Sequence, residues 1–111
     1  MPKSRYLGAF EQMLMLAALR LRDEAYGTRI AEEIRERSGR SVNRGSLYVS
    51  FDRLEARGLI ESTYTSGDDP RRGRRRRIVR VTPKGLDALR EVRAALTGLW
   101  DGLEAELDGR A

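Results

Sequence analysis

The stretch that decides the fold is NRGSLYVSFDRLEARG, which runs from Asn43 to Gly58. Asn43 is a favourable N-cap, because its side-chain oxygen can accept a hydrogen bond from a backbone N–H two or three residues ahead. Gly58 suits the left-handed position after a last helical turn, and Leu59 beyond it can contact Leu54, as in a Schellman ending. Signals at both ends therefore predict a helix of about fourteen residues.

This predicted helix has two contrasting faces. Leu47, Phe51 and Leu54 share one face and are predicted to enter the core, whereas Gly45, Val49, Arg53 and Ala56 lie roughly opposite, with Ser46 and Tyr48 on the flanks. A small, polar or basic face suits entry into the major groove of DNA, and only Asp52 opposes it. The alternative is an ordinary amphipathic helix with a solvated polar face. The candidate DNA-binding residues here are Asn43, Arg44, Gly45, Ser46, Tyr48, Val49 and Arg53.

The residues that follow predict a β-hairpin with a basic tip. Residues 60–65 and 77–82 are rich in β-branched residues, and the turn formers of residues 66–70 lie between them. Such a hairpin beside a groove-reading helix can hold flanking phosphates or the minor groove. An arginine run is also a common solvated or RNA-binding feature. The candidate wing residues are Arg71, Arg72, Arg74, Arg75, Arg76 and Arg77.

Two helices are predicted upstream. Apolar residues at helical spacing from Phe10 to Leu21 are joined on other faces by Met15, Leu16 and Leu19, so this first helix is expected to be largely surrounded by protein. A second, amphipathic helix begins near Tyr26 and stops at Ser38-Gly39. Its short link to residue 43 is typical of a helix-turn-helix.

Thr82-Pro83 predicts the start of a last helix that extends to about Leu107. An apolar stripe along it needs a partner, and a second copy of the helix is favoured over packing within the chain. Trp100 lies beside the stripe, where a place in the dimer interface is favoured over a role in binding an effector. Gly98 and Gly102 each weaken the helix by roughly 1 kcal/mol. The candidate dimer residues are Leu86, Leu89, Val92, Leu96, Leu99, Trp100, Leu103 and Leu107.

The composition limits the function. The 111 residues fit one small domain, and a net charge of +5 with a pI near 10.2 is typical of nucleic-acid binders. The absence of Cys and His removes the commonest nucleophile, acid–base and metal-ligand side chains, so we expect no enzyme, no metal and no cofactor. The adjacent carboxylates Glu32-Glu33 and Asp68-Asp69 are expected to be solvated. The apolar run 13–19 is too short to span a membrane, which favours a soluble, cytoplasmic protein.

Five motifs together resemble the PadR family of bacterial transcriptional regulators: Leu7–Gln12, Tyr26-Gly27, Gly45–Tyr48, Arg53–Leu59 and Arg80–Gly85. The resemblance covers nearly the whole chain and is to the short branch with a single C-terminal helix. It implies a homodimer on a palindromic operator, usually a repressor, released in some members by phenolic or other hydrophobic small molecules. It also places the recognition helix at Asn43–Arg57, with Tyr48 on a phosphate, and the wing at Thr65–Arg77. Ile78-Val79 and Phe51 depart from the family's usual residues.

The sequence therefore predicts a mainly α protein with a small β-hairpin. Residues 5–82 would form a winged helix-turn-helix for double-stranded DNA, and residues 83–108 a C-terminal dimerisation helix. A basic RNA- or ribosome-associated module is the main alternative, although exposed stacking aromatics are few beyond Tyr48 and Tyr64. A protein-interaction adaptor that uses the C-terminal helix is a third hypothesis.

Overall fold

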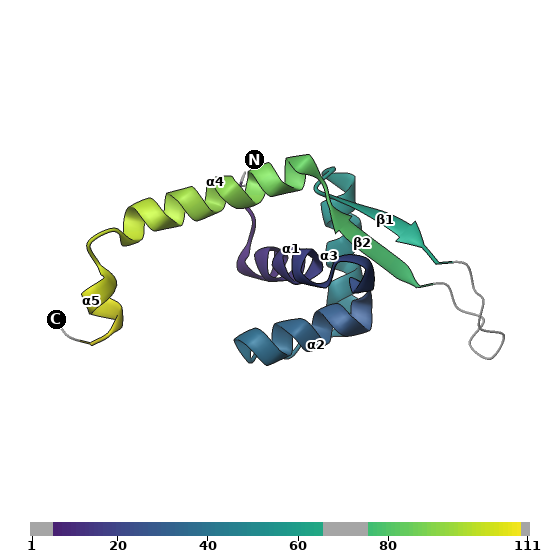
Figure 1. The fold of residues 1–111 in the computed structure, drawn as a ribbon, viewed down its shortest axis with the longest axis horizontal. Coiled ribbons are helices and arrows are strands. Elements are labelled where there is room, and N and C mark those ends of the chain that lie inside the picture. Colours follow the sequence, from purple (N-terminus) through teal and green to yellow (C-terminus); the bar gives the residue numbers. More distant parts are fainter. Residues whose placement is uncertain (1–5, 66–75, 110–111) are drawn as a thin grey trace.

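The computed structural model describes residues 6–65 and 76–109 (Figure 1). Three helices and a hairpin form a body, and a long helix runs over this body and continues past it as an arm. The principal extents of 59 × 31 × 24 Å reflect this arm. The elements are α1 (Ala9–Leu21), a short 3-10 turn η1 (Arg22–Glu24), α2 (Gly27–Ser38), α3 (Arg44–Ala56), β1 (Ile60–Tyr64), β2 (Arg77–Val81), α4 (Pro83–Trp100) and α5 (Glu104–Leu107). The predicted fold class, mainly helical with one antiparallel hairpin, is confirmed.

The core lies where α1, α2, α3 and the hairpin meet. Leu14 and Met15 of α1 and Ile30 of α2 are fully buried there, together with Leu47, Phe51 and Leu54 of α3. The expectation that α1 is surrounded by protein is wrong, because Leu16 and Leu19 are exposed. Within the described chain α1 packs against α2, α3 and β2, and these elements leave one of its faces open.

The predicted helix ends are confirmed by their hydrogen bonds. The Asn43 side-chain oxygen accepts from the Ser46 N–H at 3.1 Å and caps α3. At the other end Gly58 adopts φ +75°, and the Leu59 N–H donates to the Leu54 carbonyl at 3.0 Å, which completes the Schellman ending. The Thr82 hydroxyl accepts from the Gly85 N–H at 3.0 Å and caps α4. Local signals therefore fix both ends of α3 and the start of α4.

The hairpin is tied to the helices through the chain just before α2. Ile60 pairs with Val81 and Tyr64 with Arg77 in the antiparallel ladder. On the other edge of β2, the Val79 N–H donates to the Ala25 carbonyl at 3.0 Å, and Tyr26 forms a bridge with Ile78. Because β2 is bonded on both sides, the base of the hairpin has a fixed place on the body.

The last helix is shorter than predicted. It ends at Trp100, and after a turn containing Gly102, with φ +84°, the short α5 sets off in another direction (Figure 1). Asp101 leaves the helical conformation with φ −53° and ψ 123°, and Gly102 completes a turn in which the Leu103 N–H donates to the Trp100 carbonyl at 2.8 Å, so the continuous helix predicted to about Leu107 is wrong at this point. Gly98 stays helical. Across residues 6–65 and 76–109, no helix is both long and apolar enough to cross a bilayer.

Candidate nucleic-acid interface

The outer face of α3 is open to solvent. Leu47, Phe51 and Leu54 are fully buried, whereas the predicted DNA-binding residues of this helix are exposed, Val49 at 49% and Tyr48 at 43%. Their surface is small, polar or basic. The exposed members are Asn43, Arg44, Gly45, Ser46, Tyr48, Val49 and Arg53. The sequence therefore assigned the two faces of α3 correctly, and the structure brings these seven residues to one side of the body.

The first turn of α3 is held by two polar contacts. Asn43 uses its side-chain oxygen as the helix cap, and Arg44 donates from Nη2 to the hydroxyl of Thr28 in α2 at 3.0 Å. Thr28 did not stand out in the sequence, because a single hydroxyl sixteen residues away gives no periodic signal. The Asn43 bond caps α3, and the Arg44 bond ties the start of α3 to α2.

Tyr48 lies against the first residue of α2. Its ring meets that of Phe51 edge to face, with centroids 5.5 Å apart. A Cβ on Gly27 would lie 2.6 Å from the Tyr48 hydroxyl oxygen, so glycine at this position makes room for the ring. The Tyr48 hydroxyl is therefore held at the junction of α2 and α3, on the same side as the exposed residues of α3.

The six candidate arginines of the wing divide into two groups. Arg71, Arg72, Arg74 and Arg75 lie outside the described residues. Arg76 lies directly before β2, and its guanidinium carbon is 4.4 Å from the ring centroid of Tyr26. Its backbone N–H also donates to the Thr65 hydroxyl at 3.0 Å. Tyr26, where the second helix was predicted to begin, also makes this cation–π contact.

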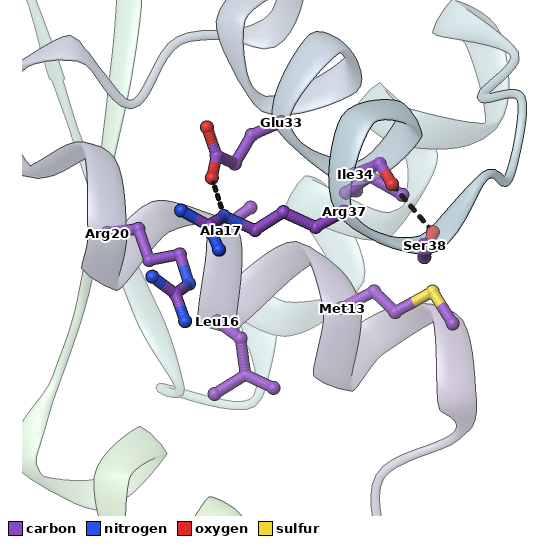
Figure 2. Close-up of a pocket in the computed structure, with 8 residues that line it drawn as sticks. All are labelled: Met13, Leu16, Ala17, Arg20, Glu33, Ile34, Arg37 and Ser38. Carbon is purple, nitrogen blue, oxygen red and sulfur yellow. Dashed lines mark hydrogen bonds and ion pairs between the residues drawn. The ribbon is translucent and has the colours of Figure 1, made fainter.

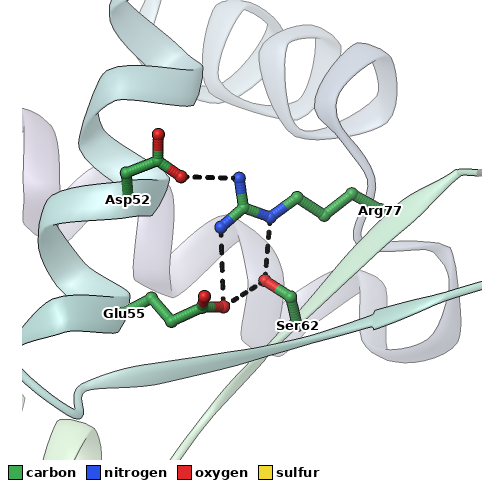
Figure 3. A network of polar contacts seen from close by, with 4 residues as sticks. All are labelled: Asp52, Glu55, Ser62 and Arg77. Carbon is green, nitrogen blue, oxygen red and sulfur yellow. Dashed lines mark hydrogen bonds and ion pairs between the residues drawn. The ribbon is translucent and has the colours of Figure 1, made fainter.

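Arg77 differs from the expectation of a solvent-facing wing arginine, since only 13% of its side chain is exposed (Figure 3). Nη1 lies 2.9 Å from the Asp52 carboxylate and Nη2 lies 3.5 Å from that of Glu55. Nε donates to the Ser62 hydroxyl at 2.8 Å, and Ser62 in turn hydrogen-bonds Glu55. Residue 77 points toward α3 because the alternation of β2 turns it there. Its donors are thus used inside the domain.

The charge of Arg77 is maintained by these partners. Burial of the guanidinium opposes its charged form, but the hydrogen bond to Asp52 and the nearby Glu55 carboxylate act the other way, and the net effect raises the pKa of Arg77. The guanidinium therefore carries its positive charge at neutral pH. It offsets carboxylate charge on the exposed side of α3, which would otherwise face an approaching phosphate backbone.

The predicted dimer stripe divides into two parts along the chain. Leu86 and Leu89 pack partly buried against the core of the body, and Val92 is buried. Beyond Val92 the apolar residues are exposed, with Leu99 at 73%. The exposed members are Leu96, Leu99, Trp100, Leu103 and Leu107. Packing within the chain, the less favoured alternative, therefore accounts for the first half of α4 alone.

A shallow cleft of about 170 Å³ lies between α1 and α2 (Figure 2). Its apolar lining comes from Met13, Leu16, Ala17 and Ile34, and charged side chains border it. Glu33, expected to be solvated, is instead buried and paired with Arg37 one turn along α2. Pockets for drug-sized ligands occupy roughly 300–1,000 Å³, so the cleft of a single chain is small for such a ligand.

Helices α2 and α3, joined by a short turn and followed by a two-stranded hairpin, define a winged helix-turn-helix, a fold of DNA-binding transcription regulators. The family model described as "Transcriptional regulator PadR-like family" matches residues 15–91. This chain belongs to that family, and it is a transcriptional regulator.

Relatives of known sequence and structure agree with this assignment. The chain is 42% identical over 77 residues to the transcriptional regulator Rv3488 of Mycobacterium tuberculosis, which covers 69% of this chain and 67% of the relative. A PadR family transcription regulator from Clostridium difficile R20291 superposes with a TM-score of 0.68 at 27% identity, covering 89% of this chain and 98% of that one. One from Eggerthella lenta gives 0.67 at 32% identity, covering 86% and 81%.

Proposed function

We propose that this regulator is a homodimeric repressor that binds a palindromic operator in double-stranded DNA. The observation that carries the proposal is the exposed face of α3, which presents glycine, hydroxyl and arginine residues to solvent. The opposite face of the same helix is anchored in the core by three fully buried apolar residues. A helix presented in this way can enter the major groove, and its Arg44 and Arg53 have the chemistry to contact guanine or phosphate. We refer to α3 below as the recognition helix and to the whole β1–β2 hairpin, which contains the expected Thr65–Arg77 stretch, as the wing.

The exposed apolar residues of the arm support a dimer. Leu96, Leu99 and Trp100 expose apolar surface on one continuous segment, and burying them against a second copy would remove that surface from water. In a two-fold dimer the two recognition helices would enter successive major grooves about 34 Å apart, which is what a palindromic site demands. Residues 5–82 would bind DNA, and residues 83–108 would supply the dimer contacts.

The wing would supply affinity more than specificity. Arg71, Arg72, Arg74, Arg75 and Arg76 carry charge that suits flanking phosphates or the minor groove. If the dimer neutralises on the order of eight phosphates, log K should fall with log salt with a slope near −7. Fluorescence anisotropy over a range of salt concentrations measures this slope, and a slope near zero would exclude the proposed electrostatic contribution.

Release by a small hydrophobic or phenolic molecule is the finer part of the proposal. Trp100 is 43% exposed on the arm, so its indole could line an apolar site between two subunits. Fluorescence of this single tryptophan during titration with a set of phenols tests the idea, because a bound ring would quench or shift the emission. Unchanged emission with every phenol, while the DNA remains bound, would argue against an effector at this site.

The decisive experiment is binding to the DNA immediately upstream of the protein's own gene, compared with a scrambled duplex at physiological salt. A preference of about a thousandfold or more is expected for a sequence-specific autoregulator. Arg53→Ala should then lower the preference by about tenfold or more, since an arginine on a base edge contributes discrimination. Equal weak binding to both duplexes would mean that the upstream fragment holds no operator, and the operator would then be sought by selection from a random-sequence pool.

A further inference from the structure

We propose that Arg77 is a positioning residue, which holds the wing against the recognition helix and so sets the preference for operator DNA without touching the DNA. The inference rests on the proposed DNA-binding function. It gives Arg77 a different role from that of a wing arginine that holds phosphates or the minor groove.

The contacts of Arg77 join three elements. The guanidinium comes from β2, the two carboxylates of Asp52 and Glu55 come from the recognition helix, and the Ser62 hydroxyl comes from β1 (Figure 3). The guanidinium carbon also lies 5.4 Å from the ring centroid of Phe51, which is fully buried beneath it. A planar guanidinium with donors in three directions can satisfy this set, whereas the point charge of lysine cannot.

Asp52 and Glu55 occupy an unusual place for acidic residues in a DNA-binding protein. They lie three residues apart on the recognition helix, and 73% of the Asp52 side chain is exposed. Unpaired, both would repel phosphates, and the Tyr64–Arg77 end of the wing, beyond the base that is bonded to Ala25, would lose its tie to the recognition helix. Both carboxylates face the one guanidinium, so the pairing explains why the recognition helix carries them at all.

Positioning and direct contact have different consequences for binding. A phosphate contact adds affinity for every duplex, so its loss weakens operator and scrambled DNA by the same factor. A positioning residue is needed only where helix and wing must engage together with one fixed spacing, as in the operator complex. Its loss therefore lowers the ratio of operator affinity to scrambled affinity.

The test uses the full chain and a duplex that the wild-type protein selects from a random-sequence pool, with a scrambled duplex beside it. Three variants are compared by anisotropy: Arg77→Lys, Arg77→Gln and the control Arg80→Gln. Arg80 lies on the same strand and is exposed, so its replacement removes the same charge. We expect both Arg77 variants to lower the affinity ratio by about tenfold or more, and Arg80→Gln to leave it within about twofold.

A second experiment changes the acidic partners of Arg77 and leaves Arg77 in place. The double variant Asp52→Ala with Glu55→Ala removes two negative charges per chain at helix positions where alanine is favourable. Charge alone predicts tighter binding to both duplexes. The positioning role predicts that the ratio of operator affinity to scrambled affinity falls, because the released guanidinium no longer fixes the wing. Circular dichroism melts confirm that each variant is folded before binding is measured.

The outcomes distinguish failure of the positioning role of Arg77 from failure of the proposed operator binding. If Arg77→Lys binds like the wild type and Arg77→Gln weakens both duplexes equally, Arg77 is a phosphate contact and the inference is overturned. The inference is also overturned if the double variant keeps the wild-type ratio. If the wild-type protein itself prefers no duplex from the pool, the proposed function fails, and the positioning role fails with it.

Discussion

The body and the arm contain similar apolar residues and use them in opposite ways. In the body, Leu14, Leu47 and Leu54 are fully buried, each on a helix whose other face is solvated. In the arm beyond Val92, leucines at similar helical spacing are exposed, and Leu99 retains 73% of its accessible surface. Apolar faces with the same spacing are therefore packed against other elements in the body and exposed to solvent in the arm. This contrast shows that amphipathic spacing encodes a surface to be covered and leaves open which chain covers it.

The largest expected effect is in the body. Phe51→Ala removes a fully buried ring from beneath Tyr48 and Arg77, and it should lower the free energy of unfolding by about 3–5 kcal/mol. Urea denaturation at a fixed protein concentration measures the change. Thr97→Ala, on the exposed part of α4 and outside the candidate dimer residues, serves as the control and should stay within about 0.5 kcal/mol of the wild type. Equal losses at both positions would erase the contrast between the two regions.

One substitution made at two glycines of α4 tests the boundary between body and arm. A Cβ at Gly85 would lie 2.2 Å from the Leu59 carbonyl oxygen, so Gly85→Ala should cost about 1–3 kcal/mol of unfolding free energy. Within residues 6–65 and 76–109, such a Cβ at Gly98 would meet nothing within 4 Å apart from the adjoining backbone of its own helix, and Gly98→Ala should raise stability by about 0.5–1 kcal/mol through helix propensity. Thermal melts of the two variants should move in opposite directions; a shared direction contradicts the prediction.

The next effect is on the association of two copies of the chain, and the fold of each copy should stay unchanged. Leu99→Ala removes apolar surface that the proposed dimer would bury, and over two copies it should weaken association by about 1–2 kcal/mol, roughly tenfold. Sedimentation equilibrium over a dilution series reports the change, and the far-ultraviolet circular dichroism of the variant should match that of the wild type. A protein that is monomeric before and after the substitution would remove the arm's proposed role.

The smallest effect is at the start of the recognition helix. Asn43→Ala removes the side-chain oxygen that accepts from the Ser46 N–H, and it should cost about 1 kcal/mol of unfolding free energy. Asn43→Ser, which retains a capping oxygen, should recover most of that loss. Thermal denaturation followed by circular dichroism compares the two variants. Identical melting temperatures for both would show that the cap contributes nothing measurable.

Features set by neighbouring residues could be predicted from the sequence. Asn43, Gly58 and Thr82-Pro83 mark their helix ends through bonds that span three to five residues, and all three assignments are confirmed. The division of α3 into buried and exposed faces was predicted for the same reason, since helical periodicity alone decides it.

Two features were missed: the place where α4 ends, and the partners of Arg77 in distant parts of the chain. Gly98 and Gly102 carry the same propensity cost, yet Gly98 stays helical and Gly102 lies in the turn after Trp100 with φ +84°, so propensity did not locate the break. Arg77 looked like its neighbours in the arginine run, and its partners are 15 to 25 residues away along the chain. The one available signal was the pair of acidic residues on α3, whose charges needed a nearby cation.

The Thr82 hydroxyl that caps α4 also donates to the Gly58 carbonyl at 2.6 Å, while the Thr82 N–H donates to the Leu59 carbonyl at 3.1 Å. The end of α3 and the beginning of α4 thus share one rigid elbow. In the proposed dimer, joined through the arms, α4 would act as a lever that pivots at this elbow. A small rotation between the arms would be transmitted to both recognition helices and would change their separation across the DNA.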